Sequence, residues 1–415
     1  MDQTSPREET LTLPQKPARI AMVVLALCFA QAVLGRGLSE SFTVFLKPIS
    51  ANFGWDRAAV VSVYSLTWLA SGLTAPVVGR VFDRSGPRAV YSLGIFLLGA
   101  AFLIAAYAQQ LWQLQLSIGL CVGFGAALIG NVPNSILLGR WFGPRLPTAM
   151  AVVYSAMGAG VLILLPASQL LIDHLGWRGA YRTFGVIVLA LLVPLSLLPW
   201  RRFAAGSAHV MKKVENDHVD EGWTLSSAMR HHAFWALFST FFFTAVGMYA
   251  ISAQIVAYLI DAGFPPLQAA TAWGFSGVVL LFGMLGVTSL DGLIGRRPSV
   301  LISYAISILG IVLLWLIQFY PNYWLLTAFV ITFGSMIGSR GPLITATAIK
   351  FFRGKRVGTI FGTISIGSGL GSALGSWSGG LLHDFTHSYN QLIVFSLINV
   401  VLGMLPFLVV PALRR

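Results

Sequence analysis

The sequence predicts an all-α membrane protein with twelve transmembrane helices. Of its 415 residues, 56% are hydrophobic and only 10% are charged, and the mean hydropathy is +0.78. A water-soluble core cannot hide that much apolar surface, so lipid has to be the solvent of this chain. The apolar stretches run for roughly twenty residues without strand-like alternation, which predicts spanning helices rather than a barrel.

Apolar runs between charged, glycine or proline residues define the expected spans. The first half of the chain holds six, at 20–46, 58–79, 88–108, 111–138, 147–172 and 181–200. The second half holds six more, at 233–260, 268–290, 298–319, 323–349, 357–382 and 389–411. The first run lacks a small-residue cleavage signature, so we expect it to remain as a span.

Two halves with pseudo-symmetry are expected, because short motifs recur at an offset of about 210 residues. Arg140-Trp141-Phe142 corresponds to Lys350-Phe351-Phe352, and a glycine-bearing run follows each motif. Such repeats are typical of a transporter whose site lies between two rocking halves. The expected divisions are a cytoplasmic tail at 1–19, a six-helix bundle at 20–200, a cytoplasmic linker at 201–232, a second six-helix bundle at 233–411 and a cytoplasmic tail at 412–415.

The positive charge of the chain predicts its orientation. If the N-terminus is cytoplasmic, 21 of the 27 Lys and Arg fall in cytoplasmic segments and only four on the opposite side. Positive residues stay inside, so we expect a multi-pass protein of the bacterial inner membrane with both termini in the cytoplasm. The same clustering accounts for the net charge of +13 without nucleic acid.

The sequence contains no pattern that predicts catalysis. Cys28 and Cys121 lie inside apolar segments, and no Cys/His cluster has the spacing of metal ligands. A phosphate-binding loop, a nucleophile elbow and an extramembrane catalytic domain are all missing. We therefore expect no enzyme, no cofactor and no metal, and we expect a monomer.

The loop after the second span reads Gly79-Arg80-Val81-Phe82-Asp83-Arg84-Ser85-Gly86-Pro87-Arg88. It resembles the signature loop of the major facilitator superfamily, Gly-x-x-x-Asp-Arg-x-Gly-x-Arg, at every defined position. The resemblance implies the major facilitator fold, with two six-helix bundles around a central cavity. It also implies a cytoplasmic latch that ties span 2 to neighbouring helices in the outward-facing state, formed by Gly79, Asp83, Arg84, Gly86 and Arg88.

A narrower resemblance is to the bacterial monocarboxylate-transporter and oxalate/formate-antiporter branch. Its motifs are Ser41-Phe42-Thr43-Val44-Phe45-Leu46, Phe53-Gly54-Trp55-Asp56-Arg57, Arg140-Trp141-Phe142 and Gly176-Trp177-Arg178-Gly179-Ala180-Tyr181. Members of that branch often carry a basic residue in span 8 or span 11, and this sequence has none there. The substrate chemistry of the branch therefore does not transfer intact.

Three charged residues lie inside predicted spans, where each costs at least a few kcal/mol. Arg36 and Glu40 are four residues apart on one face of span 1, where they can pair. Spans 1 and 10 line the central cavity in the superfamily fold, so Arg340 is expected to face Arg36 across it. A guanidinium matches a carboxylate, so we expect both arginines to bind an anionic substrate. The alternative for Arg340 is a structural pairing with carbonyls freed by Gly341-Pro342.

Glu40 is the expected proton-coupling residue. While Arg36 pairs with it, its affinity for a proton is low, and a substrate carboxylate that takes Arg36 leaves the acid free to bind a proton. The alternative is a plain salt bridge. Neutral side chains that could shape the substrate site are Asn131, Tyr154, Gln254, Tyr258 and Trp273, and each could equally join helices or face lipid.

The leading functional hypothesis is a secondary transporter that moves a small organic anion, a mono- or dicarboxylate, by proton symport or anion exchange. The alternative is proton-coupled efflux of drugs or metabolites. Span 5 reads Leu164-Leu165-Pro166-Ala167-Ser168, where antiporters of the superfamily tend to carry Gly-Pro-x-x-Gly-Gly, and this counts against efflux.

Overall fold

The structure is a computed structural model that describes residues 15–206, 223–352 and 357–410. The first half contains α1 (Gln15–Phe53), α2 (Arg57–Ala105), α3 (Leu111–Leu114), the π-helix η1 (Gln115–Val122), α4 (Gly123–Leu128), α5 (Asn131–Phe142), the 3₁₀ turn η2 (Gly143–Arg145), α6 (Leu146–Ala190), α7 (Leu192–Leu197) and α8 (Trp200–Ala205). The second half contains α10 (Leu225–Met229), α11 (His232–Ser252), α12 (Ile255–Asp261), α13 (Pro266–Ile294), α14 (Arg296–Ile317), α15 (Tyr323–Phe329), the π-helix η3 (Val330–Gly334), α16 (Gly341–Phe351), α17 (Val357–Thr386) and α18 (Asn390–Val409).

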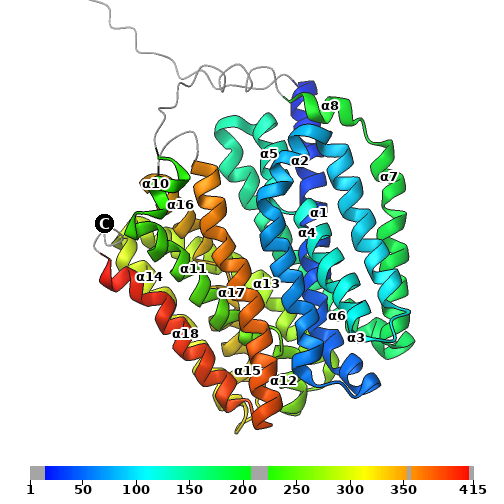
Figure 1. The fold of residues 1–415 in the computed structure, drawn as a ribbon, viewed down its shortest axis with the longest axis vertical. Helices are drawn as coiled ribbons and strands as arrows, with labels where there is room; N and C mark the ends of the chain where they lie inside the picture. The colour runs from blue at the N-terminus through cyan, green and yellow to red at the C-terminus, as the bar shows by residue number, and fades with distance from the viewer. Residues whose placement is uncertain (1–14, 207–222, 353–356, 411–415) are drawn as a thin grey trace, which may run out of the picture.

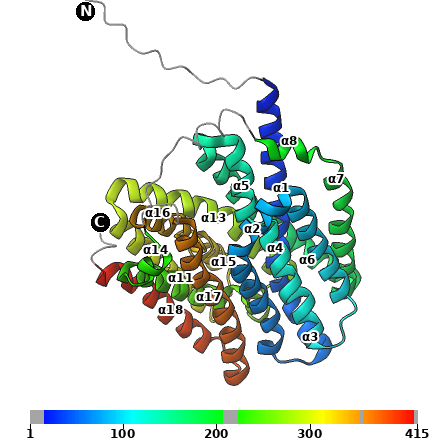
Figure 2. The same cartoon turned by 45° about the horizontal axis from the view of Figure 1, so that its top comes forward.

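The helices form two bundles side by side, one from each half of the chain (Figures 1 and 2). We call them the N half (α1 to α8) and the C half (α10 to α18). Two helix pairs carry the main contact between the halves: α2 packs on α17, and α6 packs on α13. The two ends of the molecule are named separately. The end with α8 and α10 is called the linker end, and the opposite end is called the far end.

The expected helical spans are confirmed, although two turns are tighter than the sequence suggests. Eight helical runs of the described residues are long and apolar enough to cross a membrane. Both α2 and α6 contain two spans, because the chain reverses within each of them at a glycine. Gly86 has φ +73° and Gly176 has φ +68°, a backbone conformation that only glycine adopts without strain.

Three spans that the sequence presents as continuous are interrupted near their middle. Span 4 breaks at Ile129 and Gly130, span 7 breaks between α11 and α12, and span 10 breaks between η3 and α16. Asn134 stabilises the first break, since its Nδ2 donates to the carbonyl of Ile129 at 3.2 Å. Interrupted backbone is tolerated at membrane depth only where protein or a cavity surrounds it, so these breaks indicate where a site can lie.

Glycines allow the two halves to touch backbone to backbone. A Cβ at Gly158 of α6 would overlap the carbonyl oxygen of Gly277 in α13, and the reverse holds for Gly277. On the other side, a Cβ at Gly72 of α2 would lie 3.0 Å from the Cα of Gly369 in α17. The halves therefore meet along two glycine contacts, with a cavity between them.

The tails and most of the expected linker, at 1–14, 207–222 and 411–415, lie outside the described residues.

Candidate functional site

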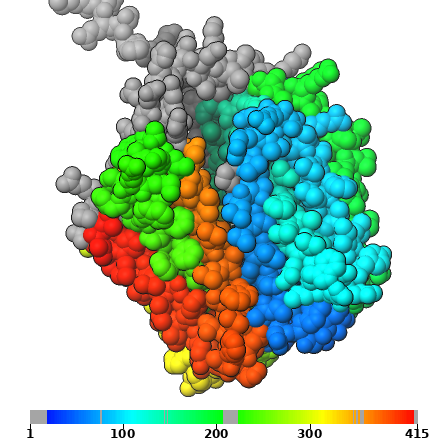
Figure 3. Space-filling model, viewed as in Figure 1, coloured from blue at the N-terminus to red at the C-terminus, as the bar shows by residue number. Residues whose placement is uncertain are grey.

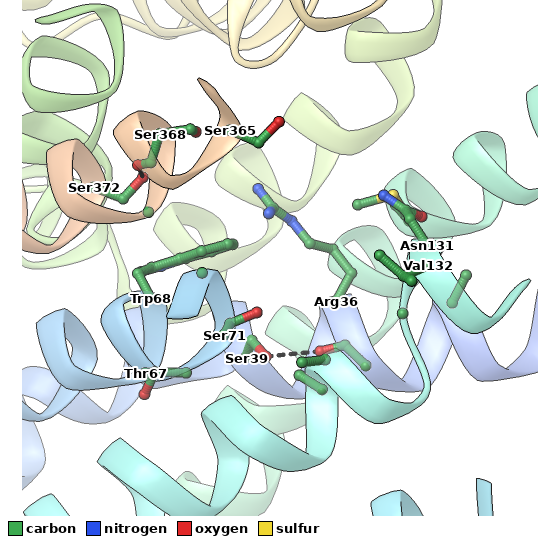
Figure 4. Close-up of a pocket in the computed structure, with 18 of the residues that line it drawn as sticks. Arg36, Ser39, Thr67, Trp68, Ser71, Asn131, Val132, Ser365, Ser368 and Ser372 are labelled. Carbon is green, nitrogen blue, oxygen red and sulfur yellow. Dashed lines mark hydrogen bonds between the residues drawn. The ribbon is translucent and has the colours of Figure 1, made fainter. Parts of the chain in front are cut away.

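A central cavity of about 350 Å³ lies between the two halves. Side chains of the N half that line it include Gln31, Arg36, Ser39, Thr67, Trp68, Ser71, Asn131 and Met157, and those of the C half include Phe241, Ser365, Ser368 and Ser372. Arg36 projects from α1 into this space, and the serines of α17 face it from the other side (Figure 4). The break in span 4 is also here, because Gly130 and Asn131 contribute to the wall.

Arg36 is at the centre of a polar network. One of its nitrogens, Nη2, pairs with Oε1 of Glu40 at 2.7 Å and donates to the hydroxyl of Tyr249 at 3.2 Å. The guanidinium carbon lies 4.8 Å from the ring centre of Trp68, a cation–π distance. Nε and Nη1 donate to none of the described residues. An edge of the guanidinium therefore remains available to a ligand in the cavity.

Glu40 is buried behind Arg36, with 4% of its surface exposed. Its Oε2 accepts a hydrogen bond from Tyr64 at 2.7 Å, so each carboxylate oxygen has one partner. Tyr249 belongs to α11, whereas Arg36, Glu40 and Tyr64 belong to the N half. The network therefore crosses from one half to the other.

Arg340 does not line this cavity, contrary to the sequence-based expectation. It is 3% exposed and lies inside the C half, at the break of span 10. Its Nε donates to Ser303 Oγ at 2.9 Å, and its Nη2 donates to the Ser303 carbonyl at 2.6 Å and to Ser307 Oγ. The guanidinium also stacks 4.0 Å from the ring centre of Tyr304. Arg340 thus clamps the broken span 10 onto α14. The pairing is structural, as in the alternative raised from the sequence, but its partners belong to α14 rather than to the carbonyls freed by Gly341-Pro342.

The neutral candidates separate into two groups. Asn131 lines the central cavity. Trp273 lines a neighbouring void of about 20 Å³ that Arg36 and Glu40 also border. Tyr154 and Gln254 line neither space.

Tyr258 and Gln254 have different surroundings from those expected. The Tyr258 hydroxyl donates to the Leu314 carbonyl at 2.6 Å, so it joins α12 to α14 rather than facing the cavity. Gln254 is 1% exposed, and neither Oε1 nor Nε2 has a hydrogen-bond partner among the described residues.

The sequence reasoning missed Gln31, Trp68 and the α17 serines. The serines do carry a signal, since positions 365, 368 and 372 share one face of a helix. Gln31 is an isolated amide in an apolar stretch of span 1. Neither pattern tells which face meets the cavity, because that depends on how the halves pack.

The Major Facilitator Superfamily model matches residues 25–376 of this chain. The chain belongs to this superfamily. It is therefore a membrane-embedded secondary transporter and not an enzyme, as the sequence predicted.

Relatives of this superfamily member include transporters of bacteria and animals. The chain is 24% identical over 398 residues to the uncharacterized MFS-type transporter YcxA of Bacillus subtilis (strain 168), which covers 94% of this chain and 96% of that one. It is 26% identical over 385 residues to monocarboxylate transporter 3 of Rattus norvegicus, covering 92% and 78%.

A solved transporter structure has the same fold. The crystal structure of a bacterial homologue of the human lysosomal transporter Spinster, in an inward-facing and occupied conformation, matches with a TM-score of 0.70. The match covers 96% of this chain and 97% of that one at 15% identity, so it shows the fold alone.

An inter-half ion-pair network closes the far end of this major facilitator protein. Asp261 of α12 accepts from Lys47 of α1 at 2.5 Å and from Arg57 of α2 at 2.6 Å. Tyr389 also donates to Asp261, at 2.6 Å, and lies against Arg57. Asp384 of α17 accepts from the backbone N–H groups of Arg57, at 3.0 Å, and of the next residue. We call this set the far-end gate.

His383 lies beside the gate, and its surroundings favour the neutral imidazole. Burial, together with nearby Arg57, lowers the pKa of His383 from its ordinary value near 6.5. Its Nδ1 lies 3.8 Å from Asp384, too far for a hydrogen bond, and that carboxylate is already occupied by backbone donors. The lowered pKa therefore disfavours a positive charge on His383 in the closed gate.

The signature loop lies at the linker end of the superfamily member. Asp83, Arg84 and Arg88 are exposed and make no ion pair with the described residues. Gly86 provides the turn between spans 2 and 3. The surface between the halves is hollowed at this same end (Figure 3).

Proposed function

We propose that this transporter carries a small organic anion, a mono- or dicarboxylate, by proton symport or anion exchange. The observation that carries the proposal is the free edge of Arg36 in the central cavity. Arg36 is the one charged side chain among the described residues of the cavity wall. A guanidinium with free N–H groups matches a carboxylate. The names of the monocarboxylate transporter relatives support the same class.

The distribution of charge supports an orientation for this proposal. Most Lys and Arg of the described residues lie toward the linker end, which supports a cytoplasmic location for that end. The far-end gate is closed and the surface is hollowed at the linker end, so this conformation would be inward-facing. The exposed Asp83, Arg84 and Arg88 agree with a latch that engages only in the outward-facing state.

The Arg36–Glu40 pair supports a coupling mechanism. A substrate carboxylate that binds Arg36 competes with Glu40 for the same cation. A buried carboxylate that loses its cation binds a proton more readily, because its charged form is no longer compensated. Proton and anion would then move together. In exchange, the incoming anion replaces the outgoing one on Arg36.

Uptake into proteoliposomes tests the proposal. We would measure labelled lactate, pyruvate, oxalate and formate with and without an inward proton gradient, in the wild type, Arg36→Ala and Arg36→Lys. Arg36→Ala should reduce uptake at least tenfold, because the buried anion loses its partner. Arg36→Lys should retain part of it. Arg182→Ala is the matched control, since Arg182 is exposed and lies over Tyr107 outside the cavity.

Uptake that does not depend on Arg36 would contradict the assignment of the anion site. Failure of every anion under both conditions would favour the alternative of proton-coupled efflux, which proton-driven export of drugs would then test.

A further inference from the structure

The orientation of α17 about its own axis is fixed by glycines. Each glycine on one face lies against a backbone carbonyl oxygen of α11. The pairs are Gly367 with Phe238, Gly371 with Phe242, Gly375 with Val246 and Gly379 with Ala250. Any side chain on this face would push the two helices apart. A neighbouring face of α17 is therefore held toward the central cavity, and it carries Ser365, Ser368 and Ser372 (Figure 4).

Two of these serines keep their hydroxyls free. A serine inside a helix usually donates back to a carbonyl three or four residues earlier. Ser372 does so at 2.8 Å and Ser376 at 2.7 Å. The hydroxyls of Ser365 and Ser368 make no hydrogen bond to the described residues, although both side chains line the cavity.

An independent observation points to a ligand in the same cavity. Gln31 of α1 lines the cavity from the N half and is 2% exposed. Its Oε1 has no hydrogen-bond partner among the described residues. An unpaired buried polar group is unfavourable by about 1–3 kcal/mol, so such a group signals a missing partner.

We propose that Ser365 and Ser368, together with Gln31, bind a hydroxyl or carbonyl group on the carbon chain of the transported acid. Arg36 binds the carboxylate of the same molecule, so this inference rests on the proposed function. Serine and glutamine side chains both donate and accept, which suits such a substituent. The cavity of about 350 Å³ is at the small end of ligand sites, which fits a short, substituted acid.

The arrangement places one substrate against both halves. Arg36 and Gln31 belong to α1, whereas the serines belong to α17. A substrate that contacts both halves stabilises the conformation in which they approach, whereas an unsubstituted acid contacts one half through polar groups alone. The serines thus fill the place across the cavity that the sequence had assigned to Arg340.

The test compares acids that differ by one hydroxyl. Initial uptake rates of lactate against propionate, and of 3-hydroxybutyrate against butyrate, are measured in proteoliposomes of the full chain. The wild type should prefer the hydroxylated acid by about tenfold. The Ser365→Ala/Ser368→Ala double variant should reduce that preference to about twofold or less. Ser365→Thr/Ser368→Thr keeps both hydroxyls and should restore it. Ser376→Ala is the matched control, because its hydroxyl already bonds to a carbonyl of the same helix.

The outcomes separate this inference from the proposed function. Either of two results would overturn the serine assignment alone. In the first, acid uptake requires Arg36 but shows no preference for the hydroxylated acid. In the second, the preference is unchanged in the double alanine variant. Absence of uptake for all four acids would overturn the proposed function, and this inference with it.

Discussion

At the scale of single residues, the two arginines inside the spans have different surroundings. Arg36 has a free edge in a cavity, whereas Arg340 is buried in the C half, where its Nε and Nη2 bond to α14 and its Nη1 has no partner among the described residues. Both were conspicuous in the sequence because charge is rare in spans. Their contacts in the structure distinguish the two residues, and a substitution of each one tests its role.

Glu40→Gln should separate transport from proton coupling. Glutamine keeps the size of the side chain and can still accept from Tyr64, but it cannot take up a proton. We expect anion exchange to persist while accumulation driven by a proton gradient falls at least tenfold. Counterflow and gradient-driven uptake of the same labelled acid measure the two activities. Proton-driven accumulation that equals the wild type would leave Glu40 as a salt-bridge partner only.

Arg340→Lys should weaken the fold more than it changes substrate affinity. Lysine keeps the charge but lacks the planar fork that bonds Ser303 and Ser307 together. We expect a loss of about 2 kcal/mol in stability, read as a lower melting temperature in detergent. The KM of the remaining uptake should stay within about twofold. A normal melting temperature with a tenfold higher KM would instead place Arg340 among the substrate ligands.

At the scale of helices, glycine positions decide which surfaces can meet. α6 and α13 cross where Gly158 and Gly277 touch, and the pair of α2 and α17 does the same at Gly72 and Gly369. Each crossing joins one helix of the N half to one helix of the C half through a pair of glycines. Close contact without side chains lets one helix tilt on the other, as alternating access requires.

Gly277→Ala should disturb the crossing of α6 and α13. The added Cβ would overlap the Gly158 carbonyl, so the halves have to separate locally. We expect a loss of about 2 kcal/mol in thermal stability and slower uptake. Gly286→Ala is the matched control in the same helix, since a Cβ there meets nothing within 4 Å. Equal melting temperatures for the two variants would show that the crossing tolerates a side chain.

At the scale of the whole molecule, the far-end gate holds one conformation. Asp261 receives one cation from α1, one from α2 and a tyrosine hydroxyl from the residue that precedes α18, and it is the acid of the C half that binds both Lys47 and Arg57. Opening of the far end has to separate these groups. The balance between the two conformations therefore depends on this carboxylate.

Asp261→Asn should shift the protein toward the outward-open conformation. The amide keeps the shape but loses the charge that holds Lys47 and Arg57. Spin labels at Ala51 and Pro321, exposed at the far end in opposite halves, report the separation. The labels are attached in a background in which Cys28 and Cys121 are replaced. There we expect Asp261→Asn to populate a longer distance between the labels than the wild type does. A distance distribution identical to that of the wild type would show that other contacts keep the far end closed.

The gate should also loosen in acid. Burial and Arg57 lower the pKa of His383 in the closed gate, and opening would return it toward 6.5. As the pH falls through that value, the open state binds a proton that the closed state does not, so closure loses stability. The same spin labels should show more of the long distance at pH 5.5 than at pH 8. His383→Gln should remove the change, and persistence of the full change in that variant would assign it to another group.

The sequence by itself determined the membrane setting, the helical spans, the superfamily and the residues where charge is unusual. Those features depend on composition, on hydropathy along the chain and on the motif from Gly79 to Arg88, all of which are local. It also identified the Arg36–Glu40 pair, because residues four apart share a helix face.

Only the tertiary structure decided which side chains meet in the cavity. Arg340 contacts α14 instead of the cavity, and three spans are interrupted. Ser365, Ser368 and Gln31 line the site. The physical reason is that helix periodicity specifies which residues share a face, but not which neighbour that face contacts. That choice comes from the packing of glycine surfaces between helices far apart in the chain.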